Sequence, residues 1–230
     1  MIKFYFNLSP NPTKVALLLE ELGLPYEPIP VDPRKGEQFT PEYLAINPNA
    51  KVPAIVDDGT TVFDSNAILL YLAEKTGRFL PASAAKRGEL LSWLMFVATG
   101  IGPYSGQAVH FHHFVPQPQP YGVNRYDFEV ERHYKIVDER LGKQPYMLGD
   151  EYTIVDMALW GWARLIPRAL AIDDALDKFP NVKRLHDEIN ARPAVTEGVE
   201  RLREMYKFKE EWDEDARRWM FPQLARMGLK

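Results

Sequence analysis

The chain has 230 residues, of which 46% are hydrophobic and 26% charged, and its net charge is −4. This composition is typical of a folded globular protein, and the lack of a basic block argues against nucleic acid as a partner. The chain contains no cysteine, which excludes a disulfide framework, a thiolate metal site and a cysteine nucleophile. Any thiol chemistry must therefore use a thiol that a ligand brings.

The N-terminal part of the chain predicts a small mixed sheet with helices on its faces. Gly23 is a good helix stop, and Pro28 and Pro30 place the strand that contains them at an edge of the sheet. We expect strands at 2–6, 26–31, 54–56 and 61–63, helices at 13–22 and from 65, and a short helical turn within 34–43. The element order is therefore β-α-β-α-β-β-α.

The stretch 47–77 combines a proline-bent loop, a hairpin and a helix start. Asp58-Gly59 predicts the tight turn between the two strands. Ser65 is predicted to be the N-cap of the helix that follows. The stretch thus brings backbone N–H groups, a hydroxyl and a helix N-terminus together, a combination that suits a carboxylate or thiolate ligand.

Beyond residue 83 no strand pattern remains, and we expect an all-α C-terminal part. The pattern predicts domains at 1–80 and 87–230, joined by a linker at 81–86. Helices are expected at 85–113, with a kink near Gly100, Gly102 and Pro103, at 123–141, from 154 and at 181–192. Residues 206–230 form a charged, aromatic tail to which the sequence assigns no role.

Two further features concern the C-terminal part and the cell compartment. Thr153 to Asp156 is a capping box with Asp in place of Glu or Gln. His110 and His113 share a helix face, but no third ligand is suitably spaced, so we expect no metal. No apolar run approaches a membrane span and the chain begins directly on a strand pattern, so we expect no signal peptide, no membrane partner and a cytoplasmic protein.

Three motifs resemble the cytosolic glutathione transferases over nearly the whole chain. They are Asn-Pro-x-x-Lys-Val-Pro at 47–53, Asp-Ser-x-Ala-Ile at 64–68, and the capping box with its preceding loop at 149–156. The resemblance implies a thioredoxin-like N-terminal glutathione-binding domain followed by an all-α helical domain. It also implies a homodimer.

Further motifs resemble the bacterial Nu-class, whose members reduce glutathione disulfide and organic disulfides. These are Ser-Pro-Asn at 9–11, Lys-Gly-Glu-Gln-Phe at 35–39, and two polar-aromatic patterns at 107–111 and 121–126. The yeast nitrogen regulator of the same fold shares much of this pattern.

The resemblance implies roles for residues that grip the glutathione peptide. Ser65 would hold the γ-glutamyl carboxylate, aided by the helix dipole, and Asp64 would pair with the γ-glutamyl ammonium. A cis bond before Pro53 would turn the backbone of Val52 outward, so that it pairs with the cysteinyl backbone as an added strand would. Lys51 would contact the glycyl end.

The resemblance also implies residues that would bind the glycyl end, the thiolate and a carboxylate of glutathione. Gln38 would join Lys51 at the glycyl end. Asn11 and Ser9 would be the catalytic pair that stabilises the glutathione thiolate, because hydrogen bonds to a thiolate lower the pKa of the thiol. Tyr5 is a rival for that role, although its place within the strand favours the core. Arg125 would bind a glutathione carboxylate, in its own site or the partner's, or would be a solvated helix arginine.

The favoured function is thiol–disulfide exchange, in which a bound glutathione thiolate attacks glutathione disulfide or another small-molecule disulfide. Attack on an electrophilic carbon, as in conjugating or ether-cleaving transferases, remains an alternative, since the lack of cysteine fits both. A non-catalytic glutathione-binding regulatory module is an alternative of another class.

Overall fold

The computed structural model of the chain describes residues 1–81 and 83–227. It divides into two units, one formed by residues 1–68 together with the segment from 197 onward, the other by 69–196. The C-terminal tail thus belongs with the N-terminal sheet in the first unit. The domain boundaries expected from the sequence, 1–80 and 87–230, stay a prediction; residue 82 of the linker and residues 228–230 lie outside the described residues.

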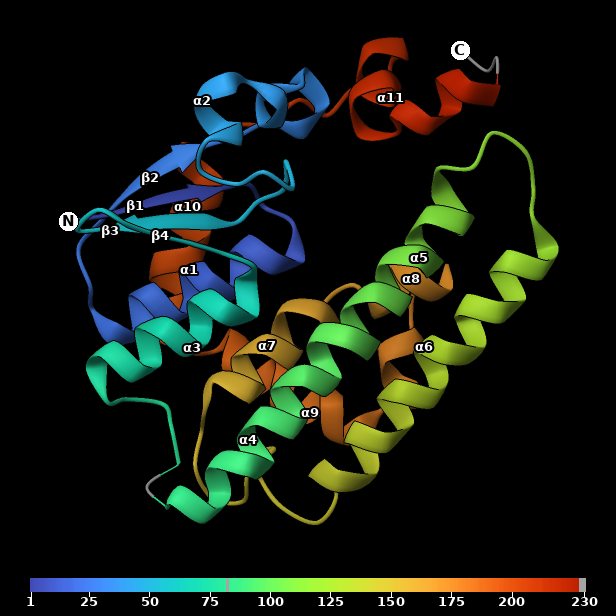
Figure 1. Ribbon diagram of the computed structural model, residues 1–230. Coiled ribbons are helices and arrows are strands. Elements are labelled where there is room, and N and C mark those ends of the chain that lie inside the picture. The colour runs from blue at the N-terminus through green and yellow to red at the C-terminus, as the bar shows by residue number, and fades with distance from the viewer. Residues whose placement is uncertain (82, 228–230) are drawn as a thin grey trace. The chain divides into compact units, whose positions relative to one another are not determined.

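Four strands form the mixed sheet of the first unit, in the order β2-β1-β3-β4 (Figure 1). Their bounds are Ile2–Phe6 for β1, Tyr26–Pro30 for β2, Ala54–Asp57 for β3 and Thr60–Phe63 for β4. β1 pairs in parallel with β2 and antiparallel with β3, and β3 and β4 form the predicted hairpin. β2 lies at an edge, as its prolines predict.

α1 (Pro10–Leu22) ends at Gly23, whose left-handed backbone makes it the C-cap, as predicted. The helix begins three residues before the expected Thr13 because prolines are tolerated in a first turn, where no intrahelical N–H bond is lost. The segment after β2 contains the short helices η1 (Pro33–Lys35), η2 (Glu37–Phe39) and α2 (Pro41–Leu44). Figure 1 shows α1 on one side of the sheet and α2 on the other.

α3 (Ser65–Thr76) begins in the first unit and continues into the second. The expected cap was wrong by one residue, because it is the Asp64 carboxylate that accepts from the N–H groups of Asn66 at 2.9 Å and Ala67 at 3.2 Å. Asp64 therefore caps the helix and Ser65 is its first residue.

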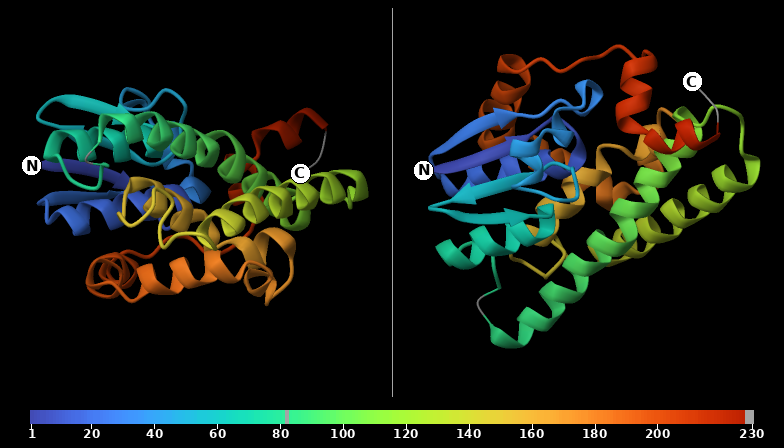
Figure 2. Two further views of the ribbon diagram at one scale, coloured as in Figure 1. Left: turned by 90° about the horizontal axis from the view of Figure 1, so that it is seen from below. Right: turned by 45° about the horizontal axis from the view of Figure 1, so that its top comes forward.

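The second unit is helical among its described residues, and its helices are seen from two more directions in Figure 2. α4 (Ala84–Phe96) runs through a π-helical turn, η3 (Val97–Ile101), into α5 (Gly102–His113), so the irregularity predicted near Gly100 is a π-bulge. The capping box is confirmed by reciprocal hydrogen bonds between Thr153 and Asp156. The remaining helices are α6 (Pro120–Leu141), α7 (Ile154–Ala163), α8 (Ile166–Leu170), η4 (Ala175–Lys178) and α9 (Pro180–Asn190).

After η5 (Ala194–Val199) and α10 (Glu200–Met205) the tail runs irregularly to α11 (Glu214–Met220) and η6 (Pro222–Met227). No helix among the described residues is long and apolar enough to cross a membrane.

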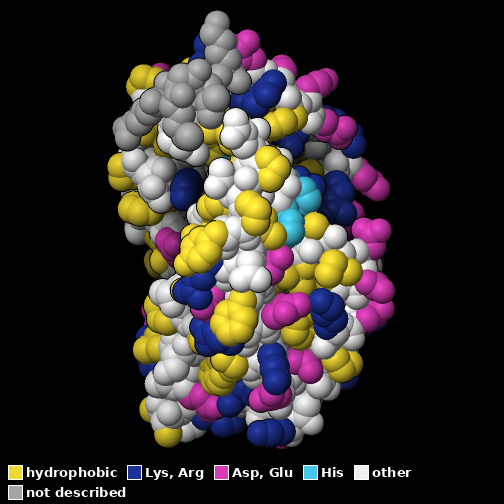
Figure 3. All heavy atoms as spheres, turned by 90° about the vertical axis from the view of Figure 1, so that its right-hand side faces the viewer, with side chains coloured by type: hydrophobic (Ala, Val, Ile, Leu, Met, Phe, Trp, Pro, Cys, Tyr) yellow, Lys and Arg dark blue, Asp and Glu magenta, His cyan; other side chains and the backbone are white. Residues whose placement is uncertain are grey.

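α6 carries exposed hydrophobic side chains, of which Tyr121 is 84% and Phe128 59% exposed. Figure 3, which faces the side of α6, shows hydrophobic side chains set among charged ones. The two residues are seven positions apart and therefore lie on one face of the helix.

Candidate functional site

A cavity of about 180 Å³ beside the predicted cis-proline gathers most of the residues expected to bind glutathione. We call it the cis-proline cavity. The peptide bond between Val52 and Pro53 is cis, as predicted. All of its lining residues belong to the first unit: Asn11, Asn47, Asn49, Lys51, Val52, Pro53, Phe63, Asp64 and Ser65.

Partly buried hydrogen bonds fix the loop that precedes Pro53. The Lys51 carbonyl accepts from the Tyr43 hydroxyl and from Asn47 Nδ2, both at 2.6 Å. Asn47 Oδ1 in turn accepts from the Asn49 N–H at 3.0 Å. Burial of Tyr43 raises the pKa of its phenol, so Tyr43 stays a neutral donor. Because Tyr43 and Asn47 hold the backbone of this loop, Lys51 and Val52 keep their places in the cavity wall.

The start of α3 forms the opposite wall. Asp64 has a left-handed backbone, with φ of 70°, which is uncommon for a residue other than glycine. Such a conformation persists where the surroundings enforce it, often at ligand sites. Ser65 is 4% exposed at the first helical position, where backbone N–H groups have no intrahelical partner. This wall suits a ligand carboxylate, since donors and the positive end of the helix dipole coincide.

A buried lysine lies under this wall. Lys14 of α1 is 0% exposed, and its Nζ donates to Asn66 Oδ1 at 2.8 Å. Burial lowers the pKa of Lys14 to about 7, opposed by the negative charge of Asp64. A positive charge can therefore reside below Asp64 at neutral pH, and sequence reasoning missed it because a lysine in an α1 pattern is usually solvated.

The two predicted catalytic residues border different cavities. Asn11, at the second position of α1, lines the cis-proline cavity. Ser9, the residue before α1, makes no side-chain cap bond, and its hydroxyl donates to Asn7 Oδ1 at 2.6 Å. Ser9 lines a separate cavity with Asn7 and the tail.

Gln38 and Arg125 do not line the cis-proline cavity. Gln38 is 4% exposed, and its Nε2 contacts the carbonyls of Pro33 at 3.3 Å and of Trp219 at 3.4 Å. The tail therefore holds its amide away from the cavity. Arg125 lies on α6 in the second unit, where it pairs with Glu129 at 2.6 Å.

The remaining candidates take structural places. Tyr5 is half-buried and packs against Tyr43, with ring centroids 5.7 Å apart. His112 pairs with Asp127, and among residues 1–81 and 83–227 no group of three His, Asp or Glu side chains could hold a metal ion.

Asn47 and Asn49 line the cavity although the sequence analysis gave them no role. The Asn-Pro-Asn run was the available signal, because an Asn side chain often bonds the backbone two residues on, as Asn47 does here.

The family model of the glutathione S-transferase N-terminal domain matches residues 8–75, and that of the C-terminal domain matches residues 114–193. The chain is 45% identical over 206 residues to the Disulfide-bond oxidoreductase YfcG of Escherichia coli, covering 86% of this chain and 94% of the relative. The chain belongs to the glutathione S-transferase family.

Solved structures of other members resemble this glutathione S-transferase closely. A family member from Pseudomonas fluorescens, crystallised with two glutathione bound, has a TM-score of 0.82 and 39% identity, covering 86% of this chain and 92% of that one. A glutathione transferase from Pseudomonas putida, with one glutathione disulfide bound per subunit, has a TM-score of 0.80 and 37% identity, covering 86% and 90%. The thioredoxin-like and all-α architecture expected from the sequence is confirmed. The tail after 206 lies outside both matched segments.

Proposed function

We propose that this glutathione S-transferase is a glutathione-dependent disulfide-bond oxidoreductase of the Nu-class. The observation that supports the proposal is the cis-proline cavity, in which Asn11 shares the lining with Val52, Pro53, Asp64 and Ser65 in a chain without cysteine. Both reacting sulfurs must then come from ligands. The names of the E. coli relative and the ligands of the two Pseudomonas structures support the same chemistry.

In this proposal the cavity holds glutathione by its polar ends. Ser65 and the α3 N-terminus bind the γ-glutamyl carboxylate, Asp64 pairs with the ammonium, and Val52 pairs with the cysteinyl backbone. Lys51 serves the glycyl carboxylate, with Gln38 and Arg125 as further candidates. Asn11 donates to the thiolate from its place on the cavity wall, and Ser9 is its predicted companion.

The reaction proceeds by two exchanges. The bound thiolate attacks one sulfur of a disulfide, the S–S bond breaks, and the departing thiolate takes a proton. A second glutathione thiolate then attacks the mixed disulfide and releases glutathione disulfide. Two glutathiones are oxidised and one disulfide is reduced to two thiols, so the electrons balance without another cofactor.

We further propose a cytoplasmic homodimer. The exposed Tyr121 and Phe128 on one face of α6 supply apolar surface of the kind that association buries.

The test is turnover with glutathione and hydroxyethyl disulfide. We expect reduction by the wild-type protein and a loss of about 10- to 100-fold in kcat for Asn11→Ala, because a donor to the reacting thiolate is lost. Gln117→Ala, an amide change in an exposed loop, serves as the control. Conjugation of an electrophile without disulfide reduction would favour the transferase alternative. Glutathione binding with neither reaction would favour the regulatory module.

A further inference from the structure

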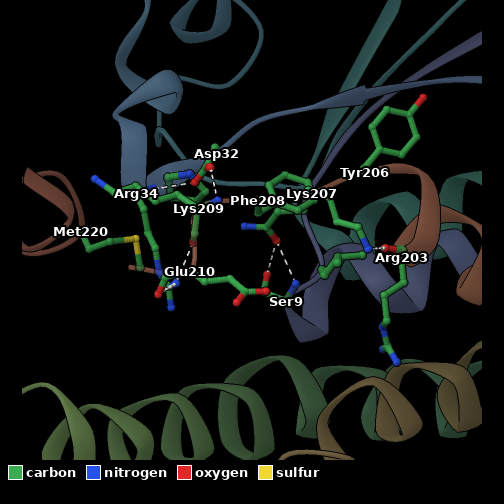
Figure 4. A pocket seen from close by; sticks show the side chains of 13 residues that line it. Ser9, Asp32, Arg34, Arg203, Tyr206, Lys207, Phe208, Lys209, Glu210 and Met220 are labelled. Carbon is green, nitrogen blue, oxygen red and sulfur yellow. Dashed lines mark hydrogen bonds between the residues drawn. The ribbon is translucent and has the colours of Figure 1, made fainter. Parts of the chain in front are cut away.

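A second cavity, of about 370 Å³, borders the turn between β1 and α1 (Figure 4). Ser9 borders it, only two positions before the Asn11 that lines the cis-proline cavity. We call it the tail cavity, because the C-terminal tail supplies nearly half of its lining residues. Its lining residues, all in the first unit, are Asn7, Leu8, Ser9, Asp32, Pro33, Arg34, Arg203, Tyr206, Lys207, Phe208, Lys209, Glu210 and Met220.

The wall of the tail cavity is anchored to the sheet. The buried Asp32 carboxylate accepts from the Lys209 N–H at 2.7 Å, and Arg34 Nη1 donates to the carbonyls of Lys209 at 2.7 Å and Glu210 at 2.6 Å. Tyr206 and Phe208 pack edge-on against Phe6 of β1. The backbone of Lys207, the residue between them, is therefore held against the sheet.

Later in the tail, the indole ring of Trp219 in α11 packs against Gly36. A Cβ on Gly36 would lie 2.6 Å from the indole ring, so the close approach depends on glycine at that position.

The cavity carries an excess of positive charge, from four cationic and two anionic lining side chains. The anionic Asp32 is already engaged by the tail backbone and by the Arg34 N–H. Of the other cations, Lys209 pairs with Asp213 at 2.6 Å, Arg203 pairs with Glu200 at 3.0 Å, and Arg34 donates to two backbone carbonyls of the tail.

Lys207 is different. It is exposed, and its Nζ lies 3.4 Å from the Arg203 carbonyl, a long contact. Among the described residues no carboxylate lies within ion-pair distance of Lys207. The tail cavity therefore contains an ammonium group that is directed at the Arg203 carbonyl (Figure 4) and that no carboxylate of the described residues neutralises.

We propose that the tail cavity binds the outgoing half of the disulfide substrate and selects disulfides that carry a carboxylate there. Lys207 binds the carboxylate. The inference rests on the proposed function and names its substrate class: an organic disulfide with an anionic group. In the first exchange the glutathione thiolate forms a bond to one sulfur of the substrate disulfide, and the S–S bond breaks. The other sulfur leaves into the tail cavity as a thiolate with the electron pair of that bond, and solvent protonates it.

The experiment compares a neutral and an anionic disulfide, hydroxyethyl disulfide and 3,3′-dithiodipropionate, by their kcat/KM with glutathione. We expect the wild-type protein to prefer the anionic substrate. Lys207→Met should lower the anionic-to-neutral ratio about 5-fold, mainly through KM, and Lys207→Glu should lower it further, because reversed charge repels the carboxylate. Lys3→Met, which removes an exposed lysine of β1 outside the cavity, should keep the wild-type ratio.

The outcomes separate this inference from the proposed function. If the wild-type protein reduces neither disulfide, the oxidoreductase proposal itself is wrong. If it reduces hydroxyethyl disulfide but shows no preference for the anionic substrate, or if both Lys207 variants keep the wild-type ratio, charge selection by the tail is wrong and the oxidoreductase proposal stands. Added salt should lower the anionic-to-neutral ratio of kcat/KM more in the wild type than in Lys207→Met, because salt screens the attraction between Lys207 and the substrate carboxylate.

Discussion

Beneath the Asp64–Ser65 wall, a single buried lysine contributes a charge that depends on pH. Lys14 is fully buried, and the negative charge of Asp64, which caps α3, acts to raise its pKa. Its ammonium donates one short hydrogen bond, to Asn66, although an ammonium has three donors. Burial of this charge therefore costs folding free energy, and the same charge favours an anion at the start of α3.

Lys14 gives stability a distinctive pH dependence. Burial lowers the pKa of Lys14 from 10.5 to about 7, so between these values the unfolded chain binds a proton that the folded chain does not. The free energy of unfolding should therefore rise from pH 7.5 to pH 9.5. Lys14→Met should flatten this rise in denaturant titrations, whereas Lys3→Met should keep it. Parallel curves for wild type and Lys14→Met would show that Lys14 does not supply the slope.

Ser65 gives a prediction for glutathione affinity. Ser65→Ala removes a hydroxyl from the wall proposed to bind the γ-glutamyl carboxylate, at a loss of about 1–2 kcal/mol for a charge-assisted bond. Calorimetry should find the Kd of glutathione raised about 5- to 30-fold. Ser92→Ala, an exposed position on α4, should leave the Kd unchanged. An unaltered Kd in Ser65→Ala would remove the hydroxyl from the proposed contact.

At the scale of the element, the capping box ties α7 to the loop before it. The fully buried Asp156 carboxylate accepts from the N–H groups of Met147 at 2.7 Å and Thr153 at 2.8 Å, and from the Thr153 hydroxyl at 3.0 Å. One side chain therefore satisfies donors from two segments.

Asp156→Ala should destabilise the fold by about 2–4 kcal/mol, because it leaves buried donors without partners. The midpoint of urea unfolding should fall accordingly. Asp150→Ala, an exposed change in the same loop, should shift it by less than about 0.5 kcal/mol. Equal midpoints for the two variants would contradict the role given to Asp156.

Local patterns in the sequence predicted elements well where one residue decides the conformation. Gly23 ends α1, and Asp58-Gly59 makes the hairpin turn; all three residues have positive φ. The Val52–Pro53 bond is cis, as the family motif implied. The cap of α3 was missed because Asp64 and Ser65 are both good caps, and only the hydrogen bonds that the Asp64 carboxylate accepts distinguish them.

Local sequence patterns could not predict contacts between residues that are far apart in the chain. The buried amide of Gln38 contacts the carbonyl of Trp219, 181 positions away, as well as that of the nearby Pro33. Lys14 is buried because α1 and the start of α3 close over it. Such pairings depend on tertiary packing, which overrides the usual behaviour of exposed polar side chains.

At the scale of the whole molecule, the proposed homodimer makes a prediction about assembly. Phe128→Glu places a charge in the apolar face of α6 and should shift the protein toward a monomer in sedimentation velocity at micromolar concentration. Ile172→Glu, a change at a 40% exposed position after α8, should sediment as the wild type. A wild-type monomer, or an unchanged dimer in Phe128→Glu, would contradict this interface.

The clamp formed by Asp32 and Arg34 has a consequence for how such enzymes can diversify. It grips the tail through the N–H and carbonyl groups of Lys209 and the carbonyl of Glu210, not through their side chains. Any residue with a free N–H could stand at 209, so proline alone is barred by this contact. Neighbouring side chains such as Lys207 can then mutate while the tail stays in place. Side chains of the tail that contact the substrate can therefore change without loss of the backbone contacts that hold the tail on the sheet. Substrate preference can then change while the glutathione-binding part of the protein stays the same.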